Sequence, residues 1–369
     1  MKIHYLATSN IPSKTANSLQ IVKMCEAFSL LGKNINLIVP NLSCINKSID
    51  NYYDLNSKIK IYKIGKKIKL MSGLNHFFLP LKIIKKSFEL RPDLIITRNL
   101  LICFVLIILK KKHIFEIHDD LSSGGKILSS LFKYLRLLNS PVLSKVIFIT
   151  KSLKKFIKKE YNYNCKNYLI LPDATDIKNY KKNYNFRKKL KKIGYFGSVY
   201  SSRGLQLIIG LSRLDKNNKY YIYGGSKDEF LEIKKFNSKN LIIHPQISYK
   251  DVKRKISEMD ILLMPYTNKA TFSGNTGNII NFMSPMKMFD YLGAGRLIIS
   301  SEIKVLKEIL KNNYNAILIK NYLNIYSWKK QIDKLNFKNN KYIKIRKNAL
   351  KTAKKYTWEK RASQMITKI

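Results

Sequence analysis

The chain has 369 residues, of which 45% are hydrophobic and 11% aromatic, which is enough to build about two domains of roughly 100–200 residues each. Its longest apolar stretch, residues 100–109, is well short of the ~20 residues that a membrane-spanning helix needs, and Met1 leads into a strand-like run without a signal peptide. The 4 cysteines form no C-x-x-C pair and the 5 histidines lack metal-ligand spacing, so we expect neither a disulfide framework nor a metal site, in a cytoplasmic protein.

The net charge is +47. Residues 1–172 carry 29 basic and 9 acidic side chains, and residues 173–369 carry 41 and 14, so the excess is spread along the chain. Abundant Lys, Asn, Ile and Tyr are typical of an AT-rich genome, which by itself raises the lysine content. Two functional explanations stay open, namely attraction to anionic surfaces and binding of nucleic acid.

In the first half, short β-branched runs alternate with segments of helical period. Strands are predicted at 2–8, 35–40, 59–64, 93–98, 113–118 and 145–150, and helices at 17–31, 76–90 and 151–160. This alternation is typical of a parallel sheet with helices on both faces.

A polar, lysine-rich segment at 173–190 is predicted to be a linker, after which the alternation restarts. Further strands are predicted at 191–197, 220–225, 241–245, 260–266, 296–300 and 315–320, and the chain looks helical from residue 340 onward. We therefore predict two Rossmann-like, doubly wound α/β domains that face a central cleft. Ligands in such sheets bind beyond the carboxyl ends of the strands.

The stretch SPMKMFDYLGAG suggests an anion site at the start of a helix. Ser284 is predicted to be its N-cap, and Lys287 falls in the first turn, where the helix dipole favours anions. Asp290 shares the face of Lys287. A surface pair of these two would contribute only ~0.3 kcal/mol, whereas a phosphate on Lys287 and ribose hydroxyls on Asp290 would use both groups. The preceding loop, 267–283, is rich in Gly, Asn and Thr and can bring backbone N–H groups close to a ligand.

A second signal is the run GYFGSVYSSRG at 194–204, a strand followed by a glycine turn and a helix. Gly197 alone is weak evidence, because it can simply allow tight packing. Arg203 at the start of the helix opposes the dipole unless an anion binds there.

In the first half, His118 ends a predicted strand, where cleft residues belong. A lone histidine is usually structural, and Asp119 and Asp120 can equally cap the next helix. Asn17 lies where the polar loop after the first strand leads into a helix, and Arg98 ends the fourth predicted strand. Both are candidate ligand-binding residues on the cleft side of the sheet. The chain lacks the P-loop, nucleophile-elbow and dinucleotide fingerprints, which argues against a dehydrogenase.

Several longer motifs resemble one family over nearly the whole chain. They are GYFGSVYSSRG, IYGG, HPQISYKDVKRKISEMDILLMPY and SPMKMFDYLGAG in the second half, with IPSKTANSLQIVKMCEAFSLLGKNINLIVP and YTWEKRA elsewhere. The chain resembles a family 4 glycosyltransferase of the GT-B fold (glycosyl transferases group 1), of the kind that builds bacterial surface polysaccharides.

The resemblance implies an acceptor-binding domain at 1–172 with a final helix, 356–369, packing back on it, and a donor domain at 191–355. Arg203 and Lys287 match residues on the donor diphosphate, Asp290 matches the acid on the ribose, and His118 matches the cleft histidine near the donor sugar. Gly197, Ser198 and Ser284 complete the implied donor site, while Asn17 and Arg98 lie on the acceptor side. Two positions depart from the pattern: Phe282 stands where the family often has the first Glu of Glu-x7-Glu, and Ser198 where a basic residue is common.

The implied reaction is retaining hexosyl transfer from a UDP- or GDP-linked sugar, without a metal or other cofactor. The implied acceptor is a lipid-linked saccharide in capsule or lipopolysaccharide synthesis, which would place the protein in the cytoplasm and at the inner membrane face. The lysine-rich segment 151–159 either packs on the sheet as an ordinary surface helix or docks on anionic lipid. The rival hypotheses are a non-catalytic sugar-nucleotide or polysaccharide-binding protein, a nucleic-acid-binding protein and a sugar-nucleotide epimerase.

Overall fold

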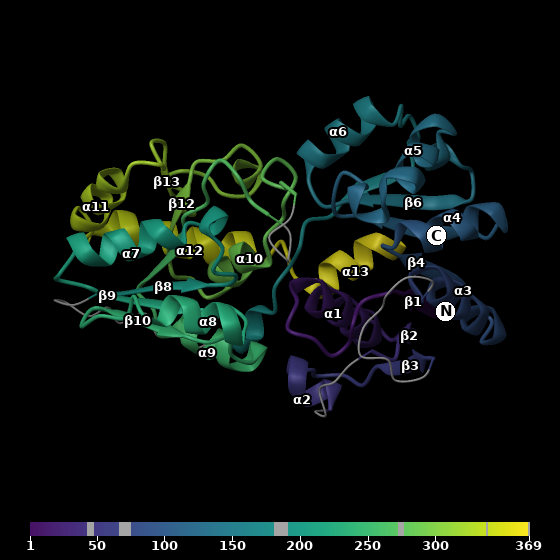
Figure 1. The fold of residues 1–369 in the computed structure, drawn as a ribbon, viewed down its shortest axis with the longest axis horizontal. Helices are drawn as coiled ribbons and strands as arrows, with labels where there is room; N and C mark the ends of the chain where they lie inside the picture. Colours follow the sequence, from purple (N-terminus) through teal and green to yellow (C-terminus); the bar gives the residue numbers. More distant parts are fainter. Residues whose placement is uncertain (43–47, 66–74, 181–190, 272–276, 337–338, 368–369) are drawn as a thin grey trace. The chain divides into compact units, whose positions relative to one another are not determined.

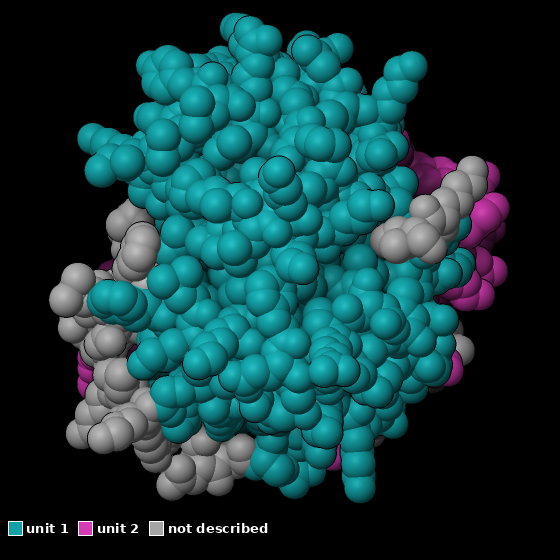
Figure 2. Space-filling view, turned by 90° about the vertical axis from the view of Figure 1, so that its right-hand side faces the viewer, with its two compact units in different colours: residues 1–173, 358–369 teal, residues 174–357 magenta. Residues whose placement is uncertain are grey.

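The computed structural model describes residues 1–42, 48–65, 75–180, 191–271, 277–336 and 339–367. The chain forms two compact units, residues 1–173 with 358–369 and residues 174–357 (Figure 2). Each unit contains one parallel sheet with helices packed on it (Figure 1). The predicted fold class, two doubly wound α/β domains, is thereby confirmed.

The sheet of unit 1 has the strand order β3-β2-β1-β4-β5-β6-β7. Its strands are β1 (Lys2–Leu6), β2 (Asn34–Pro40), β3 (Lys60–Ile64), β4 (Leu94–Thr97), β5 (His113–Ile117), β6 (Leu143–Phe148) and β7 (Tyr168–Ile170). Its helices are α1 (Ala16–Leu30), α2 (Ile49–Tyr53), α3 (Asn75–Glu89), α4 (Leu100–Ile108), α5 (Lys126–Tyr134), α6 (Lys151–Glu160) and α13 (Trp358–Ile366). The sequence predicted all of these strands except β7, a strand of three half-buried residues at the sheet edge.

Unit 2 has the strand order β10-β9-β8-β11-β12-β13. Its strands are β8 (Lys192–Phe196), β9 (Lys219–Tyr223), β10 (Leu241–His244), β11 (Ile261–Met264), β12 (Leu297–Ser301) and β13 (Ile317–Ile319). Its helices are α7 (Leu205–Leu214), α8 (Lys227–Lys234), α9 (Tyr249–Ser257), α10 (Met286–Gly293), α11 (Ile325–Asp333) and α12 (Asn340–Ala353). Each strand lies within two residues of its predicted position.

Both faces of the second sheet are buried, which is why its strands are almost wholly apolar. Along β11, Leu262 belongs to the hydrophobic cluster that includes α9 and α10, and Leu263 to the cluster that includes α7 and α11. The same alternation separates Ile298 from Ile299 in β12. Successive strand residues point to opposite faces, so the two clusters hold the helices on the two sides of the sheet.

The first segment of unit 1 ends at residue 173, and unit 2 runs from residue 174 to residue 357. The N–H of Thr175 donates to the carbonyl of Tyr356 at 3.1 Å, so the two ends of unit 2 lie side by side. Residues 181–190 of the predicted linker lie outside the described residues, and the limits 1–172, 173–190 and 191–355 stay predictions. In unit 1, α13 packs against α1.

Candidate functional site

The candidate donor residues of unit 2 lie where its strand order reverses, between β8 and β11. Gly197 directly follows β8 with a φ of +138°, and its N–H donates to the carbonyl of Tyr223 at 3.0 Å. A Cβ at Gly224, just after β9, would collide with the carbonyl oxygen of Gly197. The close approach of these two strand ends therefore requires glycine at position 224, and the positive φ favours it at 197.

Lys287 reaches from the first turn of α10 to this glycine turn. Its Nζ lies 3.9 Å from the ring centroid of Tyr195 and 5.7 Å from that of Tyr266. A Cβ built on Gly197 would come within 2.5 Å of the same Nζ, so the ammonium lies against the backbone at the end of β8. Burial lowers the pKa of Lys287 well below its usual range, and the positive charge of Arg203 lowers it further.

Arg203 approaches the same aromatic ring from the 3₁₀ turn Ser201–Arg203, which precedes α7. Its Cζ lies 5.5 Å from the ring centroid of Tyr266, and one guanidinium nitrogen donates to the carbonyl of Thr271. Its Nε is buried without a hydrogen-bond partner. An unsatisfied buried donor is costly, so a ligand acceptor that reached this nitrogen would be stabilised by it.

Within the described residues, neither Lys287 nor Arg203 makes an ion pair with a carboxylate. Two cations thus share one tyrosine ring and disfavour each other's charge. Cation–π contacts offset part of this repulsion, by about 2 kcal/mol or more for a desolvated pair. An anion bound between them would satisfy both charges, and a nucleotide diphosphate has this chemistry.

Asp290 lies one turn further along α10 and is only 5% exposed. Its Oδ1 accepts hydrogen bonds from Tyr180 at 2.7 Å, Thr175 at 2.8 Å and Tyr249 at 3.1 Å. Burial raises the pKa of this carboxyl group, although the three hydroxyl donors oppose that shift. The interpretation of Lys287 and Asp290 as an ordinary surface pair is wrong, because the two side chains contact different buried groups.

The predicted cap of α10 also differs from the structure. Pro285, with φ −74° and ψ 121°, occupies the N-cap position, and its side chain supplies no capping bond. The helix starts at Met286 because the extended backbone of Pro285 delays it by one residue. Ser284 is buried outside the helix, and Ser198 is exposed directly after the glycine turn. Residues 272–276 of loop 267–283 lie outside the described residues.

His118 and Arg98 are joined in unit 1 by a buried network that centres on Glu116, at the end of β5. Glu116 is fully buried, and Nε2 of His118 lies 2.7 Å from its Oε1. Tyr5 donates to Oε2 at 3.0 Å, and Gln20 donates to Oε1 at 2.9 Å. Arg98 donates in turn to the amide oxygen of Gln20 at 2.8 Å.

The network also holds the C-terminal helix. Arg361 of α13 donates to Oε1 of Glu116 and, at 2.8 Å, to the carbonyl of Pro172. Burial alone would raise the pKa of Glu116, but the charge of Arg361 and the contact with His118 hold it well below its usual range. A glutamate that stays ionised inside unit 1 therefore ties α13 to His118.

The same arrangement determines which nitrogen of His118 carries hydrogen. Burial and the charge of Arg98 lower the pKa of His118 to about 4, so the ring is neutral near pH 7. Because an ionised Glu116 can only accept, the hydrogen lies on Nε2, and Nδ1 is left as an acceptor. His118 can accordingly accept a hydrogen bond from a hydroxyl group. Asn17 is outside this network, since its amide donates to Ser9 at 2.9 Å on the exposed surface.

Sequence reasoning missed the aromatic rings and the buried ion pair. In the sequence Tyr195 and Tyr266 look like ordinary core residues, although Tyr195 lies near the end of β8 and Tyr266 just beyond β11, at the carboxyl ends where ligands bind. Glu116 did carry a signal, because it is a charge inside the apolar run HIFEIH. Arg361 lies in the YTWEKRA segment, where no sequence pattern shows that the guanidinium is buried.

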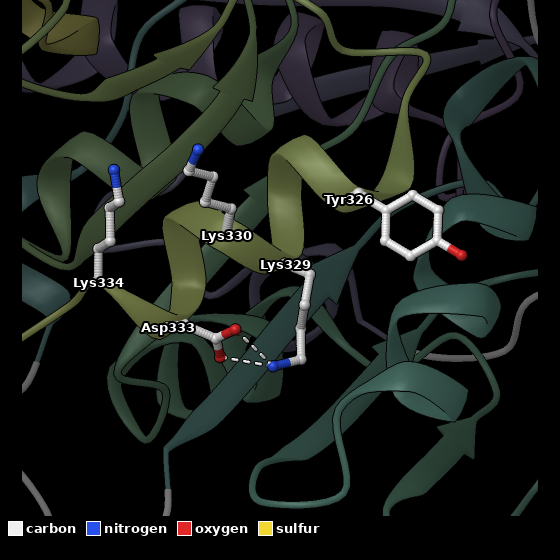
Figure 3. Close-up of a pocket in the computed structure, with 5 residues that line it drawn as sticks. All are labelled: Tyr326, Lys329, Lys330, Asp333 and Lys334. Carbon is white, nitrogen blue, oxygen red and sulfur yellow. Dashed lines mark hydrogen bonds and ion pairs between the residues drawn. The ribbon is translucent and has the colours of Figure 1, made fainter.

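A shallow hollow of about 520 Å³ lies on one side of α11 and contains none of these residues (Figure 3). It is lined by Tyr326, Lys329, Lys330, Asp333 and Lys334. Lys329 and Asp333 form an ion pair of 2.5 Å across one turn of the helix. Such exposed pairs are common on helix surfaces, and we assign no ligand to this hollow. Among the described residues no cluster of three His, Cys, Asp or Glu side chains could hold a metal ion, and no helix is long and apolar enough to cross a membrane.

The fold is that of GT-B glycosyltransferases. Sucrose-phosphate synthase from Thermosynechococcus elongatus superimposes with a TM-score of 0.73 at 12% identity, covering 99% of this chain and 97% of that one. The Anabaena protein HepE in complex with UDP and glucose gives 0.72 at 13% identity, covering 100% of both chains. WaaG, a glycosyltransferase involved in lipopolysaccharide biosynthesis, gives 0.67 at 11% identity, covering 99% of this chain and 100% of that one.

The second unit also matches a family at the level of sequence. Residues 176–352 match the family model of glycosyl transferases group 1. A search of curated proteins returns no match. The matched range includes the glycine turn, Arg203, Lys287 and Asp290.

Proposed function

We propose that this protein is a retaining glycosyltransferase that moves a sugar from a UDP- or GDP-linked donor to a lipid-linked saccharide, in the synthesis of a cell-surface polysaccharide. The observation that carries the proposal is the pair Lys287 and Arg203, which share the Tyr266 ring without a carboxylate partner in the described part of unit 2. The domain match and the resemblance of the motifs support the same function.

The paired cations suit the chemistry of the leaving group. As the bond between the sugar and the diphosphate breaks, negative charge grows on the phosphate oxygens. Positive groups fixed before the reaction stabilise that charge without reorganising. Lys287 and Arg203 are held by a tyrosine ring, a glycine turn and a carbonyl, so they would meet the diphosphate already in place. We therefore expect transfer to persist in the presence of a chelator.

Asp290 is proposed to hold the ribose of the donor. Its Oδ1 already accepts from Thr175, Tyr180 and Tyr249, so these hydroxyl groups would fix the carboxylate in one orientation. In Rossmann-like domains an acidic side chain likewise accepts hydrogen bonds from ribose hydroxyls.

His118 is proposed to bind a hydroxyl group of the donor sugar or the acceptor through Nδ1. In a retaining reaction of this type, the leaving phosphate takes the proton of the acceptor hydroxyl on the same face as the departing bond. His118 then has no need to act as a nucleophile or to become charged, which fits its lowered pKa.

The first experiment is a thermal-shift and calorimetric survey with UDP, GDP, ADP and CMP and their sugar conjugates. We expect one class of base to bind, and Lys287→Met and Arg203→Met each to weaken it by about tenfold, the loss typical of a charge-assisted hydrogen bond. Lys307→Met is the matched control, because Lys307 pairs with Glu302 on the surface of the same unit at 2.7 Å. Absence of binding at millimolar concentration, or unchanged affinity in both variants, would refute the donor site.

A non-catalytic binding protein of the same fold is the second candidate, favoured by Phe282 and Ser198 at positions where the family often carries acidic and basic residues. It predicts donor binding in the same survey, but neither transfer to an added acceptor nor slow hydrolysis of the donor. The nucleic-acid hypothesis predicts instead that the affinity for polynucleotide falls steeply with salt concentration and is unchanged in Arg203→Met.

A further inference from the structure

Helix α5 of unit 1 exposes a continuous apolar face. Phe132 on its inner side is fully buried and lies 6.3 Å, between ring centroids, from both Phe104 and Phe115. Four apolar side chains point the other way, and we call them the α5 stripe: Ile127 (82% exposed), Leu131 (36%), Tyr134 (80%) and Leu135 (61%). Their spacing of four, three and one residues places them on one side of a helix.

The α5 stripe is unusual for a surface helix. Single exposed apolar residues are common on soluble proteins, but a row of large ones at helical spacing marks a surface that is covered by something else. The inner face of α5 already packs on the sheet through Phe132, so the stripe is not needed to hold the helix in place.

Basic side chains predominate beside the stripe. Lys126, Lys133 and Arg136 are exposed on α5 and just after it, and residues 126–136 contain no acidic side chain. The nearest acidic partner is Glu160 of α6, which pairs with Lys133 at 3.4 Å and leaves Lys126 and Arg136 to face an anionic surface. The neighbouring helix α6 is joined to α5 by a hydrogen bond of 2.7 Å between Ser129 and Tyr161. It adds four exposed lysines, Lys151, Lys155, Lys158 and Lys159.

This combination selects one kind of partner. A second copy of the chain would bring two positively charged surfaces together, in a protein of net charge +47, and would be repelled. A polynucleotide would use the lysines but leave the apolar side chains in water. An anionic lipid bilayer satisfies both, because apolar side chains enter the boundary between headgroups and acyl chains while lysines stay among the headgroups.

We propose that unit 1 docks on anionic lipid bilayers through the α5 stripe, with Tyr134 at headgroup level and the surrounding basic residues on lipid phosphates. This surface differs from the segment 151–159 named by the sequence. In α6 the apolar residues Leu153 and Ile157 are fully buried, so that segment packs as an ordinary surface helix and contributes only its exposed lysines to the docking surface. The proposal goes beyond the proposed transferase function and does not depend on it.

The test is co-sedimentation of the full chain with vesicles of phosphatidylcholine, alone or mixed with phosphatidylglycerol. We expect binding to the mixed vesicles only. The double variant Ile127→Ser/Tyr134→Ser should bind the mixed vesicles at least about tenfold more weakly, because each apolar side chain that enters the bilayer contributes substantially to partitioning. Leu323→Ser is the matched control, since Leu323 is 62% exposed in unit 2 and lies outside the stripe; it should bind like the wild type.

Each other outcome rejects a defined part of the idea. If added salt abolishes binding and the double variant matches the wild type, the net charge alone attracts the protein and the α5 stripe has no role. If the wild type ignores mixed vesicles but sedimentation velocity shows a dimer that the double variant loses, the partner is a second copy. Nucleotide binding measured in the same samples should be equal in all variants, so failure here is distinct from failure of the donor site.

Discussion

Nε2 of His118 lies 2.7 Å from Oε1 of Glu116, and the same oxygen receives the guanidinium of Arg361 from the C-terminal helix. One fully buried carboxylate thus orients the candidate catalytic histidine and anchors the end of the chain to unit 1. Burial in an apolar strand would by itself favour the neutral carboxyl group. The charge of Arg361 and the contact with His118 outweigh burial and keep Glu116 ionised.

This relationship predicts the tautomer of His118. Nitrogen-15 NMR of histidine-labelled protein near pH 7 should show a neutral ring with hydrogen on Nε2. In Glu116→Gln the amide group can donate to Nε2, so we expect the hydrogen to move to Nδ1 and kcat to fall by about tenfold or more, as for loss of a positioned hydrogen bond. The KM for the donor should change little. Hydrogen on Nδ1 in the wild type would contradict the assignment.

Replacing Arg361 should destabilise unit 1 and change its dependence on pH. Arg361→Met leaves Glu116 buried without its cation, at a cost of about 3–5 kcal/mol. In the wild type the lowered pKa of Glu116 gives stability that is present above its unfolded value and lost as pH falls through the folded one. In the variant, burial raises that pKa, so stability should recover as pH falls. Urea unfolding at pH 5 and pH 8 measures this, and Glu116→Gln/Arg361→Met should be more stable at pH 8 than Arg361→Met alone.

Donor binding should take up protons at pH values above the lowered pKa of Lys287 in the free site. Burial and the charge of Arg203 lower the pKa of Lys287, whereas a bound diphosphate favours the charged ammonium and raises it again. Affinity is therefore expected to fall as pH rises through the pKa of the free site. Calorimetry in buffers of different ionisation enthalpy counts the protons. Uptake should be present in the wild type and absent in Lys287→Met; no uptake in the wild type would mean that Lys287 does not meet the anion.

The glycine turn should tolerate no side chain. Gly224→Ala forces a Cβ into the carbonyl of Gly197, and Gly197→Ala forces one against Nζ of Lys287. We expect the first to destabilise unit 2 by about 1–3 kcal/mol or more and the second mainly to weaken nucleotide binding. Gly32→Ala is the control for backbone strain alone, because Gly32 has a φ of +70° but nothing within 4 Å of its Cβ position. If all three variants lose the same stability and bind nucleotide equally well, the contacts at the glycine turn do not determine stability or binding.

Much of the fold could be predicted from the sequence because both sheets are buried on two faces. Runs such as LIIT at β4 and ILLM at β11 are almost wholly apolar, and that pattern is typical of parallel strands buried on both faces. The edge strand β7 was missed because its apolar run, residues 168–171, is short and its side chains are only half-buried. The start of α10 was placed one residue early, because Ser followed by Pro matches the cap pattern while the extended backbone at Pro285 is a property of the folded loop.

The candidate site was predictable for its charged residues and not for the groups that hold them. Lys287 and Arg203 stood out because cations at the starts of helices oppose the dipole. The rings of Tyr195 and Tyr266, and the meeting of Arg361 with Glu116 across 245 residues, depend on tertiary contacts between distant segments. The roles proposed for Gly197, Ser198, Ser284 and Asp290 on the donor, and for Asn17 and Arg98 on the acceptor, stay predictions.

The central claim is that Lys287 and Arg203 bind one diphosphate together, and a double-mutant cycle tests it most directly. Titration calorimetry would compare the nucleoside diphosphate found in the survey on wild type, Lys287→Met, Arg203→Met and the double variant, with Lys307→Met as control. We predict that each single change weakens binding about tenfold and that the double change costs less than the sum, because the two cations share a ligand. Equal affinity in all five proteins, or additive losses too small to separate from the control, would contradict the claim.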